Sequence, residues 1–400
     1  TASGSSSPIS ITGLTDGQTY TTTITAINAY GPSGMSAASN SVQAEDIAGE
    51  FWTWGYNPQG ELGQGNTTSY SSPVQVGALT TWLKLSAGYE YQLAIKTDGT
   101  LWGIGKNGTG QLGQGNTTSY SSPVQVGALT DWSEVAAGYA HFASVKTDGT
   151  LWGCGNNGTG QLGQGNTTDY SSPVQVGALT DWSQVSCGEY FTLAVKTDGT
   201  LWGFGQSANG QLGQGNTTNY SSPVQVGSLT TWSIVSCQYE GTAAIKTDGS
   251  LWAWGRGGDG GLGQSNTTNY SSPVQVGALT TWAKVSGGNK AMVMLKTDGT
   301  LWTVGYGENG EIGNGADLSK SSPVQVGALT TWADMSRGQF SVHGRTTGKT
   351  LFAWGRNFQG ALGLGDTVNR NSPVQDGALT TWNASAGGMA SSMSSRAIKS

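Results

Sequence analysis

The sequence has few charged residues, few histidines and few cysteines, and these shortages exclude several kinds of function. Lys, Arg, Asp and Glu together make up 10% of the 400 residues, and the net charge is −6. Proteins that bind nucleic acid cluster Lys and Arg against the phosphates, and no such cluster occurs, so we predict no nucleic-acid partner. The two His and three Cys residues lack the spacing of metal ligands, so we predict no metal and no cofactor.

Long apolar runs are absent as well. Since a membrane-spanning helix needs about 20 consecutive apolar residues, we predict no membrane insertion. Two of the cysteines, Cys187 and Cys237, occupy equivalent positions of the repeat described next. We interpret them as small apolar residues of the core rather than as a disulfide.

A repeat of fifty residues fills the chain from Phe51 to the C-terminus. Its most regular feature is a Trp that follows a version of SSPVQVGALT, and this Trp recurs as Trp82, Trp132, Trp182, Trp232, Trp282, Trp332 and Trp382. An array of this regularity indicates seven copies of one supersecondary unit, stacked on one another. We predict that no copy contains an insertion or a deletion.

Each copy has the pattern of short β-strands. In residues 91–140, the apolar runs QLAIK and LWGIG are joined by Asp98-Gly99, a strong hairpin signal. We expect a glycine-rich turn and a short third strand in KNGTGQLGQG, a strand edge or strand start at Pro123, and a last strand from Trp132. No stretch combines a helical period with helix caps. The copies are therefore predicted to be all-β blades of about four strands, as in a β-propeller.

The two ends of the array predict how the propeller closes. The chain enters at FWTWG (51–55), which corresponds to LWGIG in the middle of a copy, and it ends at SSMSSR (391–396), which corresponds to the strand before KTDG. We therefore predict one blade built from two strands of each end, an arrangement that leaves no free sheet edge. We also expect the recurring tryptophans to pack the core rather than to bind a ligand.

Several of these motifs together resemble the RCC1 repeat, named after the regulator of chromosome condensation. The resemblance rests on LWGIGKNGTGQLGQG followed by PVQV, a Trp and AAGYAH, and it is strongest from Trp354 to Gln375. It covers residues 51–400 and implies a seven-bladed β-propeller. It also implies a structural hydrogen-bonding role for His141, because a His is typical of that repeat position.

The first fifty residues follow a different pattern. SPISITGLTDGQTYTTTITAINAYGPSG resembles the last three strands of a fibronectin type III domain, and the residues that carry the resemblance are Leu14, Gly17, Tyr20, Ala26, Asn28 and Gly31. We predict a partial β-sandwich over residues 1–44, a junction over 45–50 and the propeller over 51–400. So short a sandwich cannot bury a core alone, and we expect a longer parent protein or pairing with another chain.

We find no pattern of catalytic residues and predict that the chain is not an enzyme. His141 and His343 lack a nucleophile and a carboxylate at a spacing that would form a triad. The glycine-rich segments lack the Lys-Ser/Thr ending of a phosphate-binding loop. The NTT segments match a glycosylation sequon, but we interpret their Asn residues as turn residues that hydrogen-bond their own backbone. These are Asn66, Asn116, Asn166, Asn216 and Asn266.

The copies differ most where a turn precedes the QLAIK-type strand, and aromatic residues concentrate there in four consecutive copies. In a propeller these turns form a ring on one face, so we predict a contiguous aromatic arc. Exposed patches rich in Tyr are typical of binding surfaces. The candidate ligand-binding residues are Tyr89, Tyr91, Tyr139, His141, Phe142, Tyr190, Phe191 and Tyr239.

These features predict a non-enzymatic binding or display module of a larger extracellular or virion surface protein, such as a phage tail fibre, a decoration protein or a bacterial adhesin. Its partner would be a protein or a cell-surface glycan, with neighbouring virion or surface subunits as further contacts. One alternative is a secreted propeller that inhibits an enzyme. Another is the guanine nucleotide exchange factor that the RCC1 resemblance implies. The repeat leaves no room for the inserted β-wedge associated with that activity, and the chain has no basic tail.

Overall fold

The computed structural model describes residues 48–384 and 394–399, together with four two-residue strands near the N-terminus. These are β1 (Thr19–Tyr20), β2 (Ile27–Asn28), β3 (Gly31–Pro32) and β4 (Val42–Gln43). β1 pairs with β4 and β2 with β3, both antiparallel. The chain divides into two units, Thr1–Ile47 and Ala48–Ser400. The predicted fibronectin-like sandwich over residues 1–44 lies largely outside the described residues and stays a prediction.

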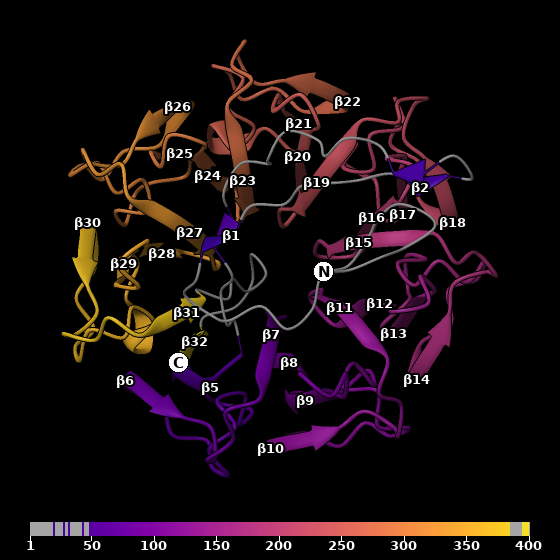
Figure 1. Ribbon diagram of the computed structural model, residues 1–400, viewed down its shortest axis with the longest axis horizontal. Helices are drawn as coiled ribbons and strands as arrows, with labels where there is room; N and C mark the ends of the chain where they lie inside the picture. Colours follow the sequence, from indigo (N-terminus) through magenta and orange to yellow (C-terminus); the bar gives the residue numbers. More distant parts are fainter. Residues whose placement is uncertain are drawn as a thin grey trace. The chain divides into compact units, whose positions relative to one another are not determined.

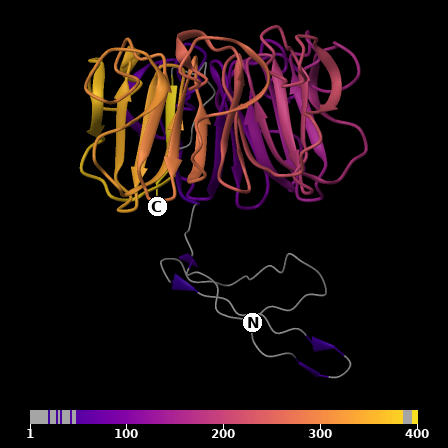
Figure 2. The same ribbon diagram turned by 90° about the horizontal axis from the view of Figure 1, so that it is seen from above.

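The second unit is a propeller of seven four-stranded antiparallel sheets, which confirms the predicted all-β, seven-bladed fold (Figure 1). One blade consists of β7 (Trp82–Ala87), β8 (Tyr91–Lys96), β9 (Leu101–Gly105) and β10 (Tyr120–Gln125). Figure 1 shows the first strand of each blade nearest the centre and the fourth at the rim. In the side view of Figure 2 the blade strands run between the two faces of the propeller.

Five further blades repeat this arrangement with the same strand order. Their strands are β11 (Trp132–Ala137), β12 (His141–Lys146), β13 (Leu151–Gly155), β14 (Tyr170–Gln175), β15 (Trp182–Cys187), β16 (Phe191–Lys196), β17 (Leu201–Gly205), β18 (Tyr220–Gln225), β19 (Trp232–Cys237), β20 (Gly241–Lys246), β21 (Leu251–Gly255), β22 (Tyr270–Gln275), β23 (Trp282–Gly287), β24 (Ala291–Lys296), β25 (Leu301–Gly305), β26 (Lys320–Gln325), β27 (Trp332–Arg337), β28 (Ser341–Thr346), β29 (Leu351–Gly355) and β30 (Arg370–Gln375). Two of these blades also contain a 3₁₀ turn, η1 (Gly258–Gly260) and η2 (Phe358–Gly360).

The blade differs from the sequence prediction at its outer strand. KNGTGQLGQG forms turns and contributes no strand, so the predicted third strand is wrong for this segment. The outermost strand β10 begins at Tyr120, three residues before Pro123. The register between β10 and β9 shifts between Tyr120 and Val124. Pro123 therefore lies in an irregular stretch of an edge strand, where its missing N–H costs no ladder hydrogen bond.

The closing blade is built from both ends of the propeller, as predicted. Its order is β31 (Trp382–Ala384), β32 (Ser394–Lys399), β5 (Glu50–Gly55) and β6 (Tyr70–Gln75). β32 therefore joins the C-terminal strand β31 to the N-terminal strand β5. Because β32 pairs with β31 on one side and with β5 on the other, closure covers the edges that these two strands would otherwise expose.

The register of β32 corrects the prediction that the copies contain no insertion. Ile398 pairs with Phe51, whereas in a regular blade Ile95 pairs with Leu101. The AIK at the end of β32 thus corresponds to the AIK that ends at Lys96. Lys96 follows Trp82 by 14 positions and Lys399 follows Trp382 by 17, so the last copy has three extra residues. They fall within 385–393, outside the described residues, and they shift the predicted final strand from 391–396 to 394–399.

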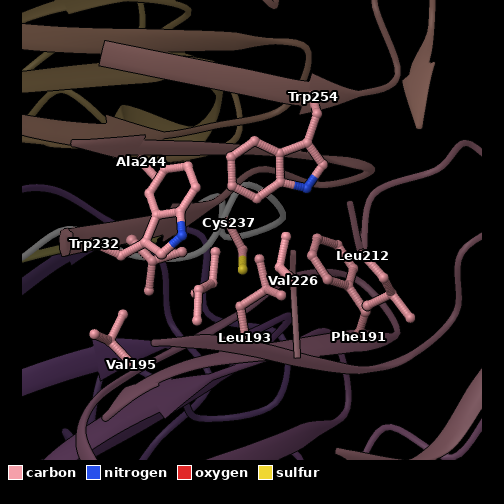
Figure 3. Packing of buried hydrophobic residues seen from close by; sticks show 11 residues of the cluster. Phe191, Leu193, Val195, Leu212, Val226, Trp232, Cys237, Ala244 and Trp254 are labelled. Carbon is pink, nitrogen blue, oxygen red and sulfur yellow. The ribbon is translucent and has the colours of Figure 1, made fainter. Parts of the chain in front are cut away.

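Core residues gather between neighbouring blades. In the cluster of Figure 3, Phe191 and Leu193 of β16 pack with Trp232 of β19 and Trp254 of β21. The seven repeated tryptophans of the innermost strands are 1–4% exposed, which confirms their role in packing. Trp82 meets the half-buried Trp102 edge to face, with ring centres 6.1 Å apart. Each Trp buries roughly 150–250 Å², so these pairs supply much of the apolar core.

The lysine of each KTDG hairpin is also structural. Lys96 Nζ lies 4.7 Å from the ring centre of Trp82 and 3.6 Å from that of Trp102, a cation–π arrangement. Lys146, Lys196, Lys246 and Lys296 sit over the corresponding pairs in their own copies. Five of the 18 Lys and Arg residues are therefore held against tryptophan rings.

The NTT segments form the predicted turns. Asn116 Oδ1 accepts the backbone N–H of Thr118 at 2.8 Å, and Asn116 Nδ2 donates to the Tyr120 hydroxyl at 3.2 Å. The same pair of contacts recurs at Asn66, Asn166, Asn216 and Asn266. These side chains close their own loops, as short polar side chains do in turns.

Candidate binding face

One face of the propeller, here called the turn face, is formed by two sets of connections. The first set joins the first and second strands of each blade, as residues 88–90 do, and the second joins the third and fourth strands, as residues 106–119 do. Antiparallel strands bring both sets to the same end of the blade. The backbone confirms this proximity, since Lys106 N–H donates to the Glu90 carbonyl at 2.8 Å.

The first set of turns is tied together around the face by backbone hydrogen bonds. Tyr89 N–H donates to the carbonyl of Tyr139 at 3.2 Å, and Tyr139 N–H donates to that of Glu189 at 3.3 Å. Glu189 N–H then donates to Tyr239 at 3.0 Å, and Tyr239 N–H to Gly288 at 3.2 Å. Five consecutive turns are thus fixed relative to one another, and their side chains form a preorganised surface.

Four of the predicted site residues form a continuous surface on these turns, here called the tyrosine arc: Tyr89, Tyr139, Tyr190 and Tyr239, all half-buried. The rings of Tyr89 and Tyr139 stack with centres 4.5 Å apart and planes 9° apart. Tyr190 follows, with its ring centre 5.6 Å from that of Tyr139. The structure therefore brings together side chains that are about fifty residues apart in sequence.

A partly buried carboxylate lies within the tyrosine arc. The Tyr239 hydroxyl donates a hydrogen bond to Glu189. Burial raises the pKa of Glu189 above its usual value, and burial, with Glu189 nearby, raises the pKa of Tyr190 to about 12. The same causes raise the pKa of Tyr239. These two phenols therefore stay protonated at physiological pH and remain hydrogen-bond donors.

Ion pairs border the arc on both sides. Lys106 Nζ lies 2.9 Å from Glu90 Oε2 and 5.0 Å from the ring centre of Tyr89. In the blade after Tyr190, Arg256 pairs with Glu240. Lys106 and Arg256 occupy the same position of their copies, as do Glu90 and Glu240. The arc thus has an aromatic centre and a charged rim.

The other four predicted site residues, Tyr91, His141, Phe142 and Phe191, are 0–1% exposed and cannot contact a partner. Each belongs to the second strand of its blade, which is buried throughout because neighbouring blades cover both of its faces. The turn ends at the residue before Tyr91, so two positions separate the surface residue Tyr89 from a core residue. The prediction of these four as ligand-binding residues is therefore corrected to a role in packing.

Two of these buried residues form polar contacts with the next blade. The Tyr91 hydroxyl donates to the Gly138 carbonyl of the next blade at 3.1 Å. His141 Nε2 lies 3.1 Å from Thr192 Oγ1, which confirms its structural hydrogen-bonding role. Burial lowers the pKa of His141 to about 3, so this ring is neutral at physiological pH.

The size of the first residue of the second strand is matched to the size of the first residue of the turn before it. A Cβ added to Gly188 would lie 1.8 Å from the Phe191 ring, so only glycine fits beneath that aromatic side chain. In the next blade Gly241 replaces the aromatic residue, and Gln238 replaces the glycine. A Cβ on Gly241 would lie 3.1 Å from Gln238 Oε1, so the glutamine occupies the space of the missing ring. Close packing beneath the turns is thus kept while the sequence changes.

A second aromatic group on the turn face was missed in the sequence. It runs across three blades as Tyr306, Phe340, Arg356, Phe358 and Tyr56, here called the arginine ladder. Neighbouring ring centres lie 6.0 Å apart for Tyr306 and Phe340 and 5.8 Å apart for Phe358 and Tyr56. Arg356 Cζ lies 5.4 Å from the ring centre of Phe340 and 5.3 Å from that of Phe358. Comparing the copies at the Lys106 position, where Tyr56, Tyr306 and Arg356 stand, would have supplied a signal for it.

Among the described residues, no group of three or more His, Cys, Asp or Glu side chains could hold a metal ion. No helix in this part of the chain has the length and apolar character that a membrane crossing requires. The three cysteines are buried as free thiols, in agreement with the predicted place of Cys187 and Cys237 in the core.

Comparison with protein families assigns the chain to one of them. The model of the RCC1-like domain matches residues 25–289, and that of the Regulator of chromosome condensation (RCC1) repeat matches residues 350–387. The chain belongs to the RCC1-like domain family. No curated protein matches its sequence.

Two solved structures show the same propeller. Human WBSCR16 is 21% identical, with a TM-score of 0.78 over 88% of this chain and 99% of that protein. Prp20p from Saccharomyces cerevisiae is 16% identical, with a TM-score of 0.77 over 88% of this chain and 92% of that protein. A further structure, also 16% identical, is that of Kap60 bound to yeast RCC1 (Prp20), with a TM-score of 0.77 over 88% of this chain and 89% of that one. At these identities the likeness shows a shared fold.

These findings contradict the predicted display module and its predicted extracellular or virion location. The matching family is that of RCC1-like proteins, and the similar structures are WBSCR16 and Prp20p rather than a phage fibre, an adhesin or a secreted inhibitor. Glycan and virion partners have no support, whereas the similar structures include one of Prp20 with a bound protein. The sequence argument failed because a neutral polar surface and a regular repeat satisfy folding and solubility in any compartment.

Proposed function

We propose that this chain is a protein-binding propeller whose partner docks on the tyrosine arc. The observation that carries the proposal is the continuous contact of Tyr89, Tyr139 and Tyr190 on one face, with the Tyr239 hydroxyl bonded next to them. The printed descriptions of the similar structures concern protein partners: Gsp1p and histones for Prp20p, and Kap60 for the same yeast protein. RCC1-like propellers are in general binding proteins, which is consistent with a site that holds no catalytic group.

Physical chemistry favours such an arc as a binding surface. Tyrosine offers a large rigid area with a polar hydroxyl and loses little conformational freedom when it is bound. The backbone ring beneath the arc removes a further ordering cost, because the turns already have fixed positions. Binding energy at protein interfaces concentrates in a few residues of this type near the centre of the contact.

Replacing Tyr139 and Tyr190 together by alanine is expected to weaken partner binding at least about tenfold, since hot-spot residues each contribute more than about 1 kcal/mol. The fold should persist because both side chains are half-buried and the turn backbone is held by its neighbours. Partners are captured by affinity purification from extracts of the source cells, and the dissociation constant of the captured protein is then measured for each variant. Thermal unfolding of both variants checks the fold.

The matched control replaces Leu129 and Leu179 by alanine. These leucines are 44% and 48% exposed and lie at the other end of the same blades. Binding should be unchanged in this variant. Equal affinity of the tyrosine variant and the wild type would exclude the arc as the docking site.

A small GTPase is the first class of partner to examine. The similarity to Prp20p, whose structure is described with its binding to Gsp1p, favours this candidate. The measurement is the release of fluorescent GDP from a panel of small GTPases in the presence of the propeller. An unchanged release rate would exclude nucleotide exchange on the GTPases of that panel. The double alanine variant of Tyr139 and Tyr190 would still test whether the arc binds a protein.

A further inference from the structure

The arginine ladder contains a cation that faces an aromatic ring where the same cation position in two other blades faces a glutamate. In the blade of Tyr89, Lys106 is paired with Glu90, and two blades before that of Arg356, Arg256 is paired with Glu240. The same two positions carry Arg356 and Phe340. This blade therefore has the cation without the carboxylate.

The guanidinium of Arg356 is held by rings rather than by charges. Its Cζ lies within 5.4 Å of the ring centres of both Phe340 and Phe358, and its backbone N–H donates to the Phe340 carbonyl at 2.8 Å. Among the described residues, no carboxylate lies within ion-pair distance of Arg356. Ring contacts restrain a guanidinium without using its N–H donors, so those donors remain available.

An open hollow of about 340 Å³ lies beside this side chain. Its described lining is one cation, Arg356, with the neutral residues Asn357, Phe358, Gln359, Thr367 and Asn369. Asn369 Oδ1 accepts the Asn357 N–H at 2.9 Å, which leaves the Asn369 amide NH₂ as a further donor. Phe358 is 39% exposed at the edge of the hollow and offers an apolar surface next to the donors.

We propose that this hollow is a second binding site, which receives an aspartate or glutamate carboxylate of a protein partner, with an apolar neighbour of that residue resting on Phe358. The carboxylate would take the place that Glu90 and Glu240 occupy in their own blades. A guanidinium offers two parallel N–H groups that match the two oxygens of a carboxylate.

The local charge favours a carboxylate over a phosphate group. Arg370, the next cation after Arg356 along the chain, is already paired with Asp366 at 2.5 Å. The hollow therefore supplies a single positive charge, which balances a carboxylate but not a phosphate dianion. The site is separate from the tyrosine arc and does not depend on the function proposed for it.

The test is an array of immobilised ten-residue peptides in which Glu or Asp stands next to Phe or Leu, beside matched peptides with Gln or Asn. The wild type should bind the acidic set at least about tenfold more tightly than the neutral set, as a charge-assisted hydrogen-bonded pair requires. Arg356→Gln should abolish the difference, and Arg356→Lys, which keeps the charge but not the bidentate geometry, should retain part of it. Equal binding of acidic and neutral peptides by the wild type would overturn the proposal.

Arg256→Gln is the matched control, because it removes the same charge from the same position of another blade. This variant should keep the preference for acidic peptides. If it lost the preference as fully as Arg356→Gln, the preference would come from the net charge of the protein, and the proposed site would be overturned. The double alanine variant of Tyr139 and Tyr190 should also keep the preference, so the failure of one site is distinguished from the failure of the other. Stronger competition by inorganic phosphate than by acetate would assign the hollow to phosphate groups and overturn the carboxylate.

Discussion

Replacing Asp376 by valine is expected to stabilise the propeller by about 4 kcal/mol at pH 8. The six other copies carry valine here, namely Val76, Val126, Val176, Val226, Val276 and Val326. Asp376 is 6% exposed, its Oδ2 has no hydrogen-bond partner in the structure, and burial raises its pKa from 3.8 to about 7. A shift of about three pKa units at about 1.4 kcal/mol per unit gives this magnitude. For a unit of this size the melting temperature should rise by about 5 °C.

The same carboxylate makes stability depend on pH in a defined direction. The folded state holds the Asp376 proton more tightly than the unfolded state does. The free energy of unfolding is therefore highest, as far as this group is concerned, below about pH 4. This contribution is lost progressively as the pH rises to about 7, where the buried group must ionise. Melting temperatures of the wild type and the valine variant at pH 5 and pH 8 measure it. The gap between the two proteins should be larger at pH 8.

A reciprocal substitution supplies the control. Val326→Asp places a carboxylate at the equivalent position of the preceding blade, where valine is 1% exposed. It should lower stability and introduce the same dependence on pH. A valine variant of Asp376 whose stability and pH dependence equal those of the wild type would show that the carboxylate is solvated in the folded protein.

Deleting residues 394–400 is expected to lower the melting temperature by about 10 °C or to abolish cooperative unfolding. The deletion removes β32, which pairs with β5 from Ser394–Gly55 to Lys399–Glu50 and with β31 on its other side. Loss of these ladders and of the buried Ala397 and Ile398 costs on the order of 5–10 kcal/mol. Differential scanning calorimetry of the truncated and full chains measures the effect.

A synthetic peptide of residues 394–400, added to the truncated chain, should restore part of the lost stability in a concentration-dependent way. A scrambled peptide of the same composition should not. A change of only a degree or two on truncation would contradict the role of β32 as the strand that closes the ring.

The repeat made the fold predictable. Seven copies of one pattern must form seven copies of one structure, and hairpins such as Asp98-Gly99 identify the strands between which they lie. The phase of the two chain ends also predicted the closing blade. The extra residues of the last copy were missed, because only the pairing of Ile398 with Phe51 reveals which residues form β32.

The candidate site was predictable in part. The turns were identified because the copies differ there, and Tyr89, Tyr139, Tyr190 and Tyr239 do lie on the surface. The burial of Tyr91, the first residue after its turn, could not be inferred from the sequence. A tyrosine stands on each side of the boundary between turn and strand, and residue type alone does not say which one is buried. The ladder was missed because Phe340, Arg356 and Phe358 come from different positions of the repeat.

The sequence by itself determined the all-β class, the blade as a unit and the closure of the ring, because these follow from periodicity and from local turn chemistry. Only the tertiary structure decided which aromatic residues face solvent, which blade lacks a carboxylate for its cation, and which valine position holds a buried acid. Each of these depends on contacts between blades. Such contacts join residues about fifty positions apart, and no local pattern in the chain records them.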